Sequence, residues 1–154
     1  MSSEIDVPRP YLGALFRLVW QWMRDQIAEE VRAAGYAELR SAHVLVFRYP
    51  GPDGLRPSEL GAQLQLSKQS INDLLGHLEQ GGYLRRAPDP ADGRARVVRL
   101  TAKGRRLERK AREAAYAAER RLVERIGPRE TEALRKTLER LARDITTARG
   151  VDAD

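Results

Sequence analysis

Cysteine is absent from the 154-residue sequence, and histidine occurs only at His43 and His77. The lack of cysteine excludes disulfides, thiolate nucleophiles, thiol-based redox sensing and cysteine-ligated zinc. The sequence also contains no Gly-x-Ser-x-Gly motif, no glycine-rich phosphate-binding loop and no visible cluster of metal ligands. These absences predict that the chain is not an enzyme and carries no cofactor or metal.

Long apolar runs are absent as well, because charged residues interrupt every apolar stretch within a few positions. The N-terminus lacks the basic region and the apolar segment of a secretory signal peptide. A chain of this length fits one compact domain, or a small module with helical extensions. We therefore expect a soluble cytoplasmic protein with no membrane partner.

Basic residues are present in excess and are unevenly distributed. Lys and Arg number 28 against 22 Asp and Glu, which gives a formal net charge of +6. Residues 84–125 alone contain fourteen Lys or Arg and six Asp or Glu, so the rest of the chain is slightly acidic. A concentrated basic segment favours a polyanionic partner such as nucleic acid.

Two helices are expected before a turn at residues 50–54. Apolar residues recur at steps of three and four over residues 11–31, after two prolines and before Gly35, which predicts an amphipathic helix. A shorter apolar helix is expected over residues 41–49. The sequence Pro-Gly-Pro-Asp-Gly that follows requires a turn.

Residues 57–100 predict two short helices and a hairpin. The first helix covers residues 57–64 and begins with proline, and after a three-residue turn Ser67 is a good N-cap for a second helix over residues 68–80. Two glycines end this helix. Strand-prone segments at 84–87 and 95–100 then flank a turn-rich stretch, which predicts a hairpin with a long tip.

Two long helices are expected in the remainder of the chain. Thr101 is a suitable cap for a helix that ends at Ile126, before a Gly-Pro pair, and a last helix covers residues 129–149. The last helix carries a narrow apolar seam at steps of four, three and four: Leu134, Leu138, Leu141 and Ile145. Such a seam is typical of packing against a partner helix.

The order helix, turn, helix, hairpin is typical of a unit that binds DNA, because one helix fits the major groove while a hairpin reaches the adjoining minor groove. Arg94 and Arg96 at the hairpin tip suit a narrow, electronegative minor groove. Two alternatives remain open. Helix-turn-helix geometry also occurs in proteins that do not bind DNA, and the two arginines are either solvated or hold the loop through Asp89 and Asp92.

Four segments carry a resemblance to a known family: PSELGAQLQLSKQSI (57–71), LEQGGYLRR (78–86), PDPADGRA (88–95) and LTAKG (100–104). They are similar to the MarR family, the multiple-antibiotic-resistance type regulators, most densely over residues 55–107. The resemblance implies a mainly α fold with a small β wing. It would place a winged helix-turn-helix over residues 41–100, with N- and C-terminal dimerisation helices over 10–35 and 101–149.

The same resemblance implies a homodimer that binds a pseudo-palindromic operator in double-stranded DNA, usually as a repressor released by a small aromatic effector. The exposed start of the recognition helix would meet bases and phosphates: Ser67, Lys68, Gln69, Ser70 and Asn72, with Gln69 and Asn72 as the base readers. Arg94 matches the wing-tip arginine. Asp92 matches the acidic residue that braces the wing, with Arg86 as a candidate partner.

Some positions leave the function open. Asp73 and His77 occupy recognition-helix positions that are often basic in the family, so a winged module with nonspecific, architectural or protein-binding function remains the alternative. Lys103, Arg105 and Arg106 either reach flanking phosphates or form a solvated face. Candidates to line an effector pocket are Trp20, Trp22, Met23, His43, Phe47 and Tyr116. Ordinary core and dimer packing is the alternative for each, and for His43 a structural hydrogen-bonded role.

Overall fold

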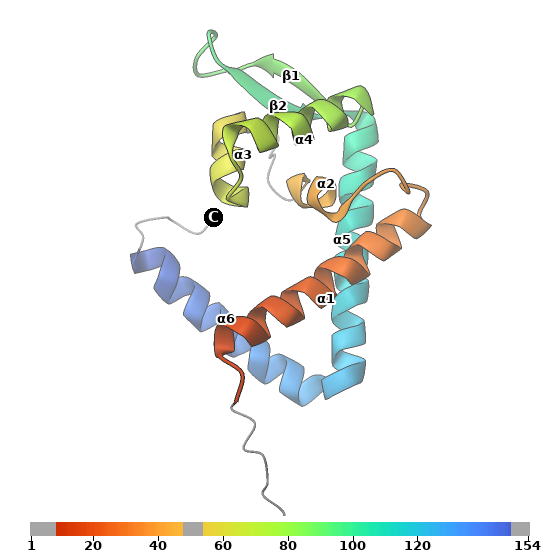
Figure 1. The fold of residues 1–154 in the computed structure, drawn as a ribbon, viewed down its shortest axis with the longest axis vertical. Coiled ribbons are helices and arrows are strands. Elements are labelled where there is room, and N and C mark those ends of the chain that lie inside the picture. The colour runs from red at the N-terminus through yellow and green to blue at the C-terminus, as the bar shows by residue number, and fades with distance from the viewer. Residues whose placement is uncertain (1–8, 48–53, 149–154) are drawn as a thin grey trace, which may run out of the picture. The chain divides into compact units, whose positions relative to one another are not determined.

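The computed structural model describes residues 9–47 and 54–148, in two compact units that meet within one helix at residue 115. The described elements are α1 (Leu12–Ala33), α2 (Ser41–Val46), α3 (Pro57–Leu64), α4 (Lys68–Gln80), β1 (Leu84–Pro88), β2 (Arg96–Leu100), α5 (Ala102–Ile126) and α6 (Pro128–Ala148) (Figure 1). The prediction of a mainly α chain with a small β element is confirmed. Residues 48 and 49, the expected end of the second helix, lie outside the described part.

The helix pair α3–α4 has the predicted bounds. Pro57 opens α3, where its fixed φ suits the first helical position. Gln65 ends α3 with a left-handed φ of 54°, which turns the chain toward α4. The Ser67 Oγ then accepts a hydrogen bond from the Ser70 N–H (3.1 Å) and so caps α4. The three-residue turn therefore holds two helices in a fixed relation.

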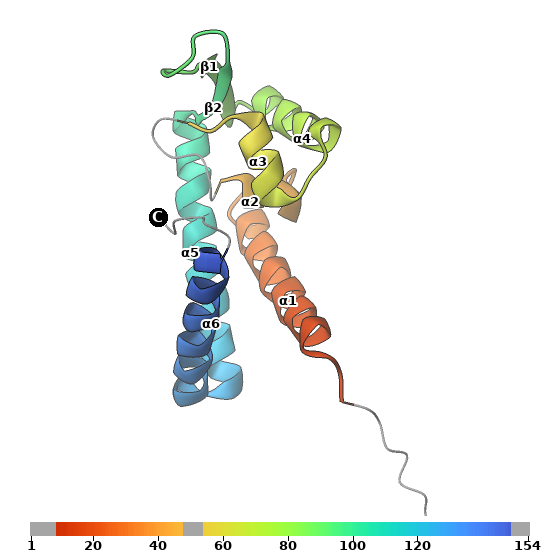
Figure 2. The same cartoon turned by 90° about the vertical axis from the view of Figure 1, so that its left-hand side faces the viewer.

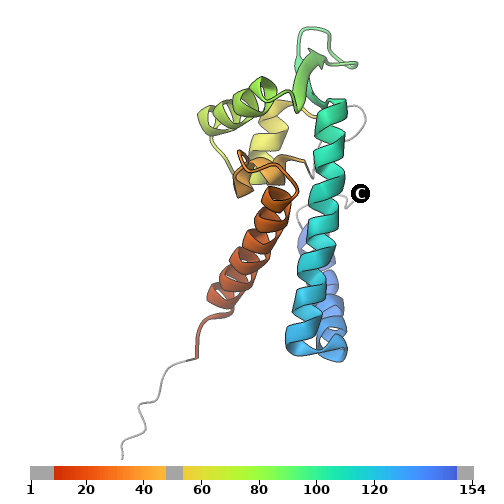
Figure 3. The same ribbon diagram turned by 90° about the vertical axis from the view of Figure 1, so that its right-hand side faces the viewer.

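The strands β1 and β2 form an antiparallel hairpin in which Arg86 faces Val98 and Pro88 faces Arg96. A short backbone bridge adds Leu55 to the other edge of β2, through two hydrogen bonds with Val98 of 3.2 and 2.9 Å. This bridge was not predicted. The side views in Figures 2 and 3 show the hairpin beside α4, with its connecting turn away from the helices.

The core of the first unit lies beneath α4 and the hairpin. Its fully buried side chains come from α1 to α5 and the hairpin: Val31, Val46, Leu60, Ile71, Leu75, Leu78, Tyr83, Val98 and Leu107. Each such side chain contributes about 1.5 to 3 kcal/mol through removal of apolar surface from water. The buried face of α4 therefore holds this helix against the core, and the opposite face of α4 is exposed to solvent.

The start of α5 packs closely against the segment between α4 and β1. The Thr101 hydroxyl accepts from the Gly104 N–H (3.1 Å) and donates to the Gly82 carbonyl (2.7 Å). A Cβ on Gly104 would lie 2.1 Å from the Tyr83 carbonyl oxygen, a backbone atom that cannot rotate away. Glycine is therefore required at position 104.

We expect Gly104→Ala to lower the free energy of unfolding by about 2 to 3 kcal/mol, because overpacking against backbone forces the helix to shift. Urea unfolding at fixed protein concentration measures the change. Gly76→Ala within α4 is the matched control, since nothing lies within 4 Å of the added Cβ. Alanine there should stabilise the helix by up to about 1 kcal/mol. Equal unfolding midpoints for Gly104→Ala and the wild type would contradict the close contact.

The second unit consists of the end of α5 and α6. The predicted break at the Gly-Pro pair is present: Gly127, with φ 86°, separates the two helices, and Pro128 is the first residue of α6, one residue earlier than expected. The Arg135 guanidinium of α6 forms an ion pair with Glu119 of α5. On α6 the predicted apolar seam is largely exposed. Among the described residues, none of the helices is both long enough and apolar enough to span a membrane.

Candidate nucleic-acid interface

The first turn of α4 presents polar side chains to solvent. Ser67, Lys68, Gln69 and Ser70 are all exposed, and the two serine hydroxyls bond to each other (2.9 Å). Asn72 is half-buried, and its side-chain amide donates to the Lys68 carbonyl (2.8 Å). The structure thus separates the two predicted base readers. The Asn72 side chain is held against its own helix, whereas the Gln69 side chain forms no hydrogen bond among the described residues.

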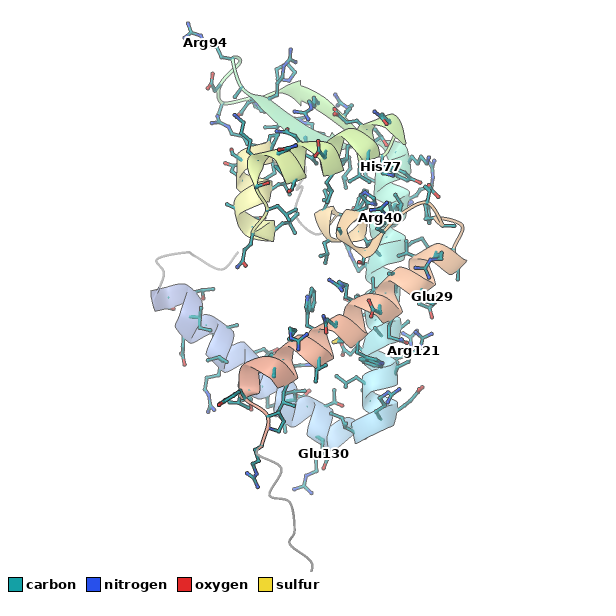
Figure 4. The ribbon with its side chains drawn as sticks, in the orientation of Figure 1. Glu29, Arg40, His77, Arg94, Arg121 and Glu130 are labelled. Atoms are coloured by element: carbon teal, nitrogen blue, oxygen red, sulfur yellow. The ribbon has the colours of Figure 1, made fainter. Side chains whose placement is uncertain are left out.

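The hairpin tip is ordered by side-chain to backbone hydrogen bonds. Asp92 Oδ1 accepts from the Arg94 N–H (3.1 Å), and its carbonyl accepts from the Ala95 N–H (2.9 Å). These bonds form a local turn of the kind that aspartate favours. Arg94 projects from the tip away from the helices (Figure 4). Arg96, at the first position of β2, is exposed as well.

The predicted pairing of Arg86 with Asp92 is wrong. Arg86 Nε lies 3.1 Å from Glu79 Oε2, so Arg86 joins β1 to α4. Arg56 is the partner of the wing acids: its Nη2 lies 2.6 Å from Asp89 Oδ2 and 3.9 Å from Asp92 Oδ2. Asp89 therefore binds neither wing arginine, and the suggestion that Asp89 holds Arg94 or Arg96 is not supported.

The basic residues that open α5 have structural partners. Lys103 Nζ donates to the Gly81 carbonyl (2.8 Å) and lies 4.1 Å from the centre of the Tyr83 ring, a cation–π distance. Arg105 Nη1 donates to the Leu100 carbonyl (3.1 Å). Lys103 therefore ties α5 to the segment between α4 and β1, and Arg105 ties it to the end of β2. Arg106 remains exposed, with no ion pair among the described residues.

Two histidine rings stack between α2 and α4. The centres of the His43 and His77 rings are 4.5 Å apart and the planes differ by 13°. His43 is buried, and its Nδ1 accepts from the Arg40 N–H (2.9 Å) at the start of α2. Figure 4 labels Arg40 and His77 on these neighbouring helices. Burial lowers the pKa of His43, and the positive charges of His77 and Arg40 lower it further.

Acid should therefore destabilise the fold through His43. Because its folded-state pKa lies below the unfolded value of about 6.5, the unfolded chain binds the proton first. The contribution is fully present above pH 6.5 and is lost as the pH falls through the folded-state pKa, with a slope of at most about 1.4 kcal/mol per pH unit. Urea unfolding between pH 7.5 and 5 measures this loss.

His43→Gln is the matched control, because glutamine at the third helical position can still accept from the N-cap N–H. The variant should show a shallower pH dependence near pH 6. An unchanged slope would mean that another group causes the acid destabilisation.

The candidate pocket residues do not share one environment. Phe47 is buried and contacts Tyr83 edge-on (6.2 Å between ring centres), which fits the core alternative. His43 has the structural role that was the alternative to ligand binding. Trp20 and Tyr116 are exposed, whereas Trp22 and Met23 are half-buried. An effector site therefore stays a prediction.

Two features of the site were missed from the sequence. Arg56 was not singled out, although it bridges α3 and the wing. Glu38 accepts a hydrogen bond from the Tyr83 hydroxyl, and burial together with this bond raises the pKa of Tyr83. Arg56 and its partner Asp89 are 33 residues apart in the sequence, and Glu38 and Tyr83 are 45 apart. Local sequence patterns therefore could not predict these pairs, and only the excess of charge in the sequence hinted at ion pairing.

Comparison with known proteins relates the chain to transcription factors. The family model described as MarR family matches residues 38–95. The chain is similar to the HTH-type transcriptional repressor Rv2887 of Mycobacterium tuberculosis, with 31% identity over 91 residues. The aligned stretch covers 59% of this chain and 66% of the repressor, just under two thirds of its length.

Solved structures share the fold over nearly the whole chain. A crystal structure of MarR superposes with a TM-score of 0.76 at 24% identity, covering 97% of this chain and 99% of the other. Rv2887 in complex with p-aminosalicylic acid gives a TM-score of 0.69 at 25% identity, with 86% and 99% covered. CouR from Rhodococcus jostii RHA1, bound to p-coumaroyl-CoA, also gives 0.69 at 25% identity, with 92% and 96% covered.

Proposed function

We propose that the chain is a sequence-specific DNA-binding transcriptional regulator of the MarR family, a proposal supported by the matched segment at residues 38–95 and by the shared fold. We place it in the cytoplasm with its DNA, as a homodimeric repressor that a small aromatic effector releases. One observation carries the proposal: the capped, exposed first turn of α4 and the wing-tip Arg94 belong to one folded unit.

The recognition helix supplies the reading surface for the major groove. The exposed amide of Gln69 has donors and an acceptor that match the edge of adenine. Ser67, Ser70 and Lys68 surround it and suit phosphate oxygens, since hydroxyl and ammonium groups are common phosphate ligands. Asn72 joins in base reading only if its bond to the Lys68 carbonyl opens, or through its free carbonyl oxygen.

The wing supplies the second contact. A guanidinium in a narrow minor groove gains from the enhanced negative potential there. Arg94 stands at the tip of a turn held by Asp92, and Arg96 follows on the same hairpin. We therefore assign Arg94 to the minor groove and Arg96 to a flanking phosphate.

Exposed apolar side chains support a homodimer. The N-terminal half of α1 exposes Leu12, Leu15, Phe16 and Val19, and α6 exposes Leu138, Leu141 and Ile145. Several exposed apolar side chains on each of these two helices favour association with a partner. We propose a second copy of this chain as the partner of these apolar side chains, because a two-fold dimer would present two wings and two recognition helices to half-sites about 34 Å apart.

The proposed effector class follows from the ligands of similar proteins. Two similar proteins were crystallised with aromatic ligands, p-aminosalicylic acid and p-coumaroyl-CoA. Trp20, Trp22 and Met23, all on α1, are the remaining candidates of the predicted set within the first unit. We propose an aromatic carboxylate as the class to screen first.

The exposed carboxylate of Asp73 favours the alternative function, nonspecific architectural binding of DNA. Asp73 is exposed on α4, where a carboxylate either accepts from the amino group of cytosine or repels phosphate. A specific regulator should prefer its operator over random duplex by about a thousandfold or more at physiological salt, and an architectural binder should not.

The test measures binding of the purified protein to DNA flanking its own gene, by fluorescence anisotropy across a salt series with random duplex as competitor. Tight, salt-sensitive and sequence-selective binding supports the regulator. Binding with the same affinity for every duplex supports the architectural alternative. Release of the selective complex by salicylate, with benzene sulfonate as control, then tests the effector class.

A further inference from the structure

Arg56 links the start of α3 to the wing. Its Nε and Nη2 atoms lie 2.7 and 2.6 Å from Asp89 Oδ2, and Nη2 lies 3.9 Å from Asp92 Oδ2. Its backbone N–H donates to Glu59 Oε2 (2.8 Å), which fixes the residue at the N-cap of α3. Two nitrogens on one carboxylate oxygen hold the guanidinium more firmly than a single contact does. The Arg56 side chain therefore connects the N-cap of α3 to Asp89 in the wing.

The wing end of this link is equally well held. Asp89 is 9% exposed and directly follows β1. Its Oδ1 accepts from the Ala91 N–H (2.8 Å), and its own N–H donates to the Ala95 carbonyl (3.1 Å). The Ala91 N–H and the Arg56 guanidinium lower the pKa of Asp89, so the carboxylate is charged at neutral pH. One carboxylate thus joins the wing turn to α3.

The link matters because the two parts of the proposed interface, α4 and the wing tip, are connected to the fold separately. A three-residue turn connects α3 to α4, so the recognition helix follows α3. The wing tip with Arg94 is joined to the same helices through β1, and Leu55 attaches β2 next to Arg56. Residues 55 and 56 therefore hold the wing at two points, by a backbone bridge at its base and by a side chain at its turn.

We propose that Arg56 is a positioning residue that sets the placement of Arg94 relative to α4, and with it the spacing of major-groove and minor-groove contacts that the protein accepts. This inference rests on the proposed function. It differs from a purely structural role, in which Arg56 would add stability without affecting which DNA is bound. It also differs from direct contact, in which Arg56 would bind phosphate itself.

A double-mutant cycle distinguishes these roles. Arg56→Ala should weaken operator binding by about tenfold, a coupling of the size seen between residues of one network. If Arg56 acts through Arg94, the same substitution should change binding by less than about twofold in an Arg94→Ala background. Arg56→Lys keeps the charge but loses the two-nitrogen contact, so it should restore only part of the affinity. Asp89→Asn should reproduce the Arg56→Ala effect without removing any cation from the surface.

Arg112→Ala is the matched control, because it breaks an exposed ion pair with Glu108 on α5 and removes the same charge. Circular dichroism melting of each variant checks the fold, and Asp89→Asn serves in its place if Arg56→Ala does not fold. An unchanged operator affinity in both variants, or a tenfold loss that persists without Arg94, overturns the inference. Absence of selective binding by the wild type instead overturns the proposed function.

Discussion

Arg94→Ala is expected to weaken binding to the operator by about a hundredfold, or about 2.7 kcal/mol, without unfolding the protein. Arg94 projects from a turn whose hydrogen bonds use the backbone and the Asp92 side chain. Its guanidinium has no ion pair among the described residues, so its removal leaves no buried charge behind. The substitution should therefore lower the affinity for DNA and leave the stability of the fold unchanged.

Fluorescence anisotropy with operator and random duplexes measures the effect. Lys136→Ala is the charge-matched control, because Lys136 is exposed on α6, outside the helix-turn-helix and the wing. It should reduce binding by no more than about threefold, the size of a screened long-range charge effect. Operator affinity that is unchanged by Arg94→Ala would refute the assignment of the wing tip to the minor groove.

Local sequence patterns predicted the elements of the DNA-binding unit well. The proline at position 57, the serine at position 67 and the glycine pair after Gln80 each act through the backbone of their own neighbourhood. The observed bounds of α3 and α4 agree with these signals. Hydrophobic periodicity over residues 11–31 likewise predicted α1, which is observed at Leu12–Ala33. Signals of this kind need no knowledge of the rest of the fold.

Long-range side-chain pairing could not be predicted in the same way. Arg56, Arg86 and Arg94 are equivalent as cations, and the sequence does not say which of them the wing carboxylates approach. Resemblance suggested Arg86 for Asp92, but β1 directs Arg86 toward Glu79 of α4. The His43–His77 stack was missed for the same reason. Periodicity indicates that a face is buried and does not indicate what lies opposite.

The structure explains why the LTAKG segment has glycine at position 104. In the sequence it was only the last residue of the LTAKG segment that carried the resemblance. In the structure it allows α5 to start against the Tyr83 carbonyl, next to the Thr101 cap. The same junction receives Lys103 through the Gly81 carbonyl. The segment therefore packs the start of α5 against the base of the wing, and the proposed contacts to DNA lie on α4 and at the wing tip.

Glutamate at both Leu138 and Leu141 is expected to dissociate the proposed homodimer and thereby abolish operator binding. These side chains are 40% and 43% exposed in the single chain and lie on the predicted seam of α6. Burial of unpaired carboxylates in an apolar interface costs several kcal/mol, so the dimer dissociation constant should rise by at least about a thousandfold. Analytical ultracentrifugation measures the change in mass.

Loss of DNA binding follows from the loss of the second half-site. A monomer keeps one recognition helix and one wing, so it retains about half of the binding free energy and therefore far less than half of the affinity. Arg140→Glu is the control, because position 140 lies on the opposite face of α6 from the seam. It should leave the mass of the dimer unchanged. A dimer that persists with both glutamates would place the interface elsewhere, and the exposed apolar face of α1 would then be the surface to test by Phe16→Glu.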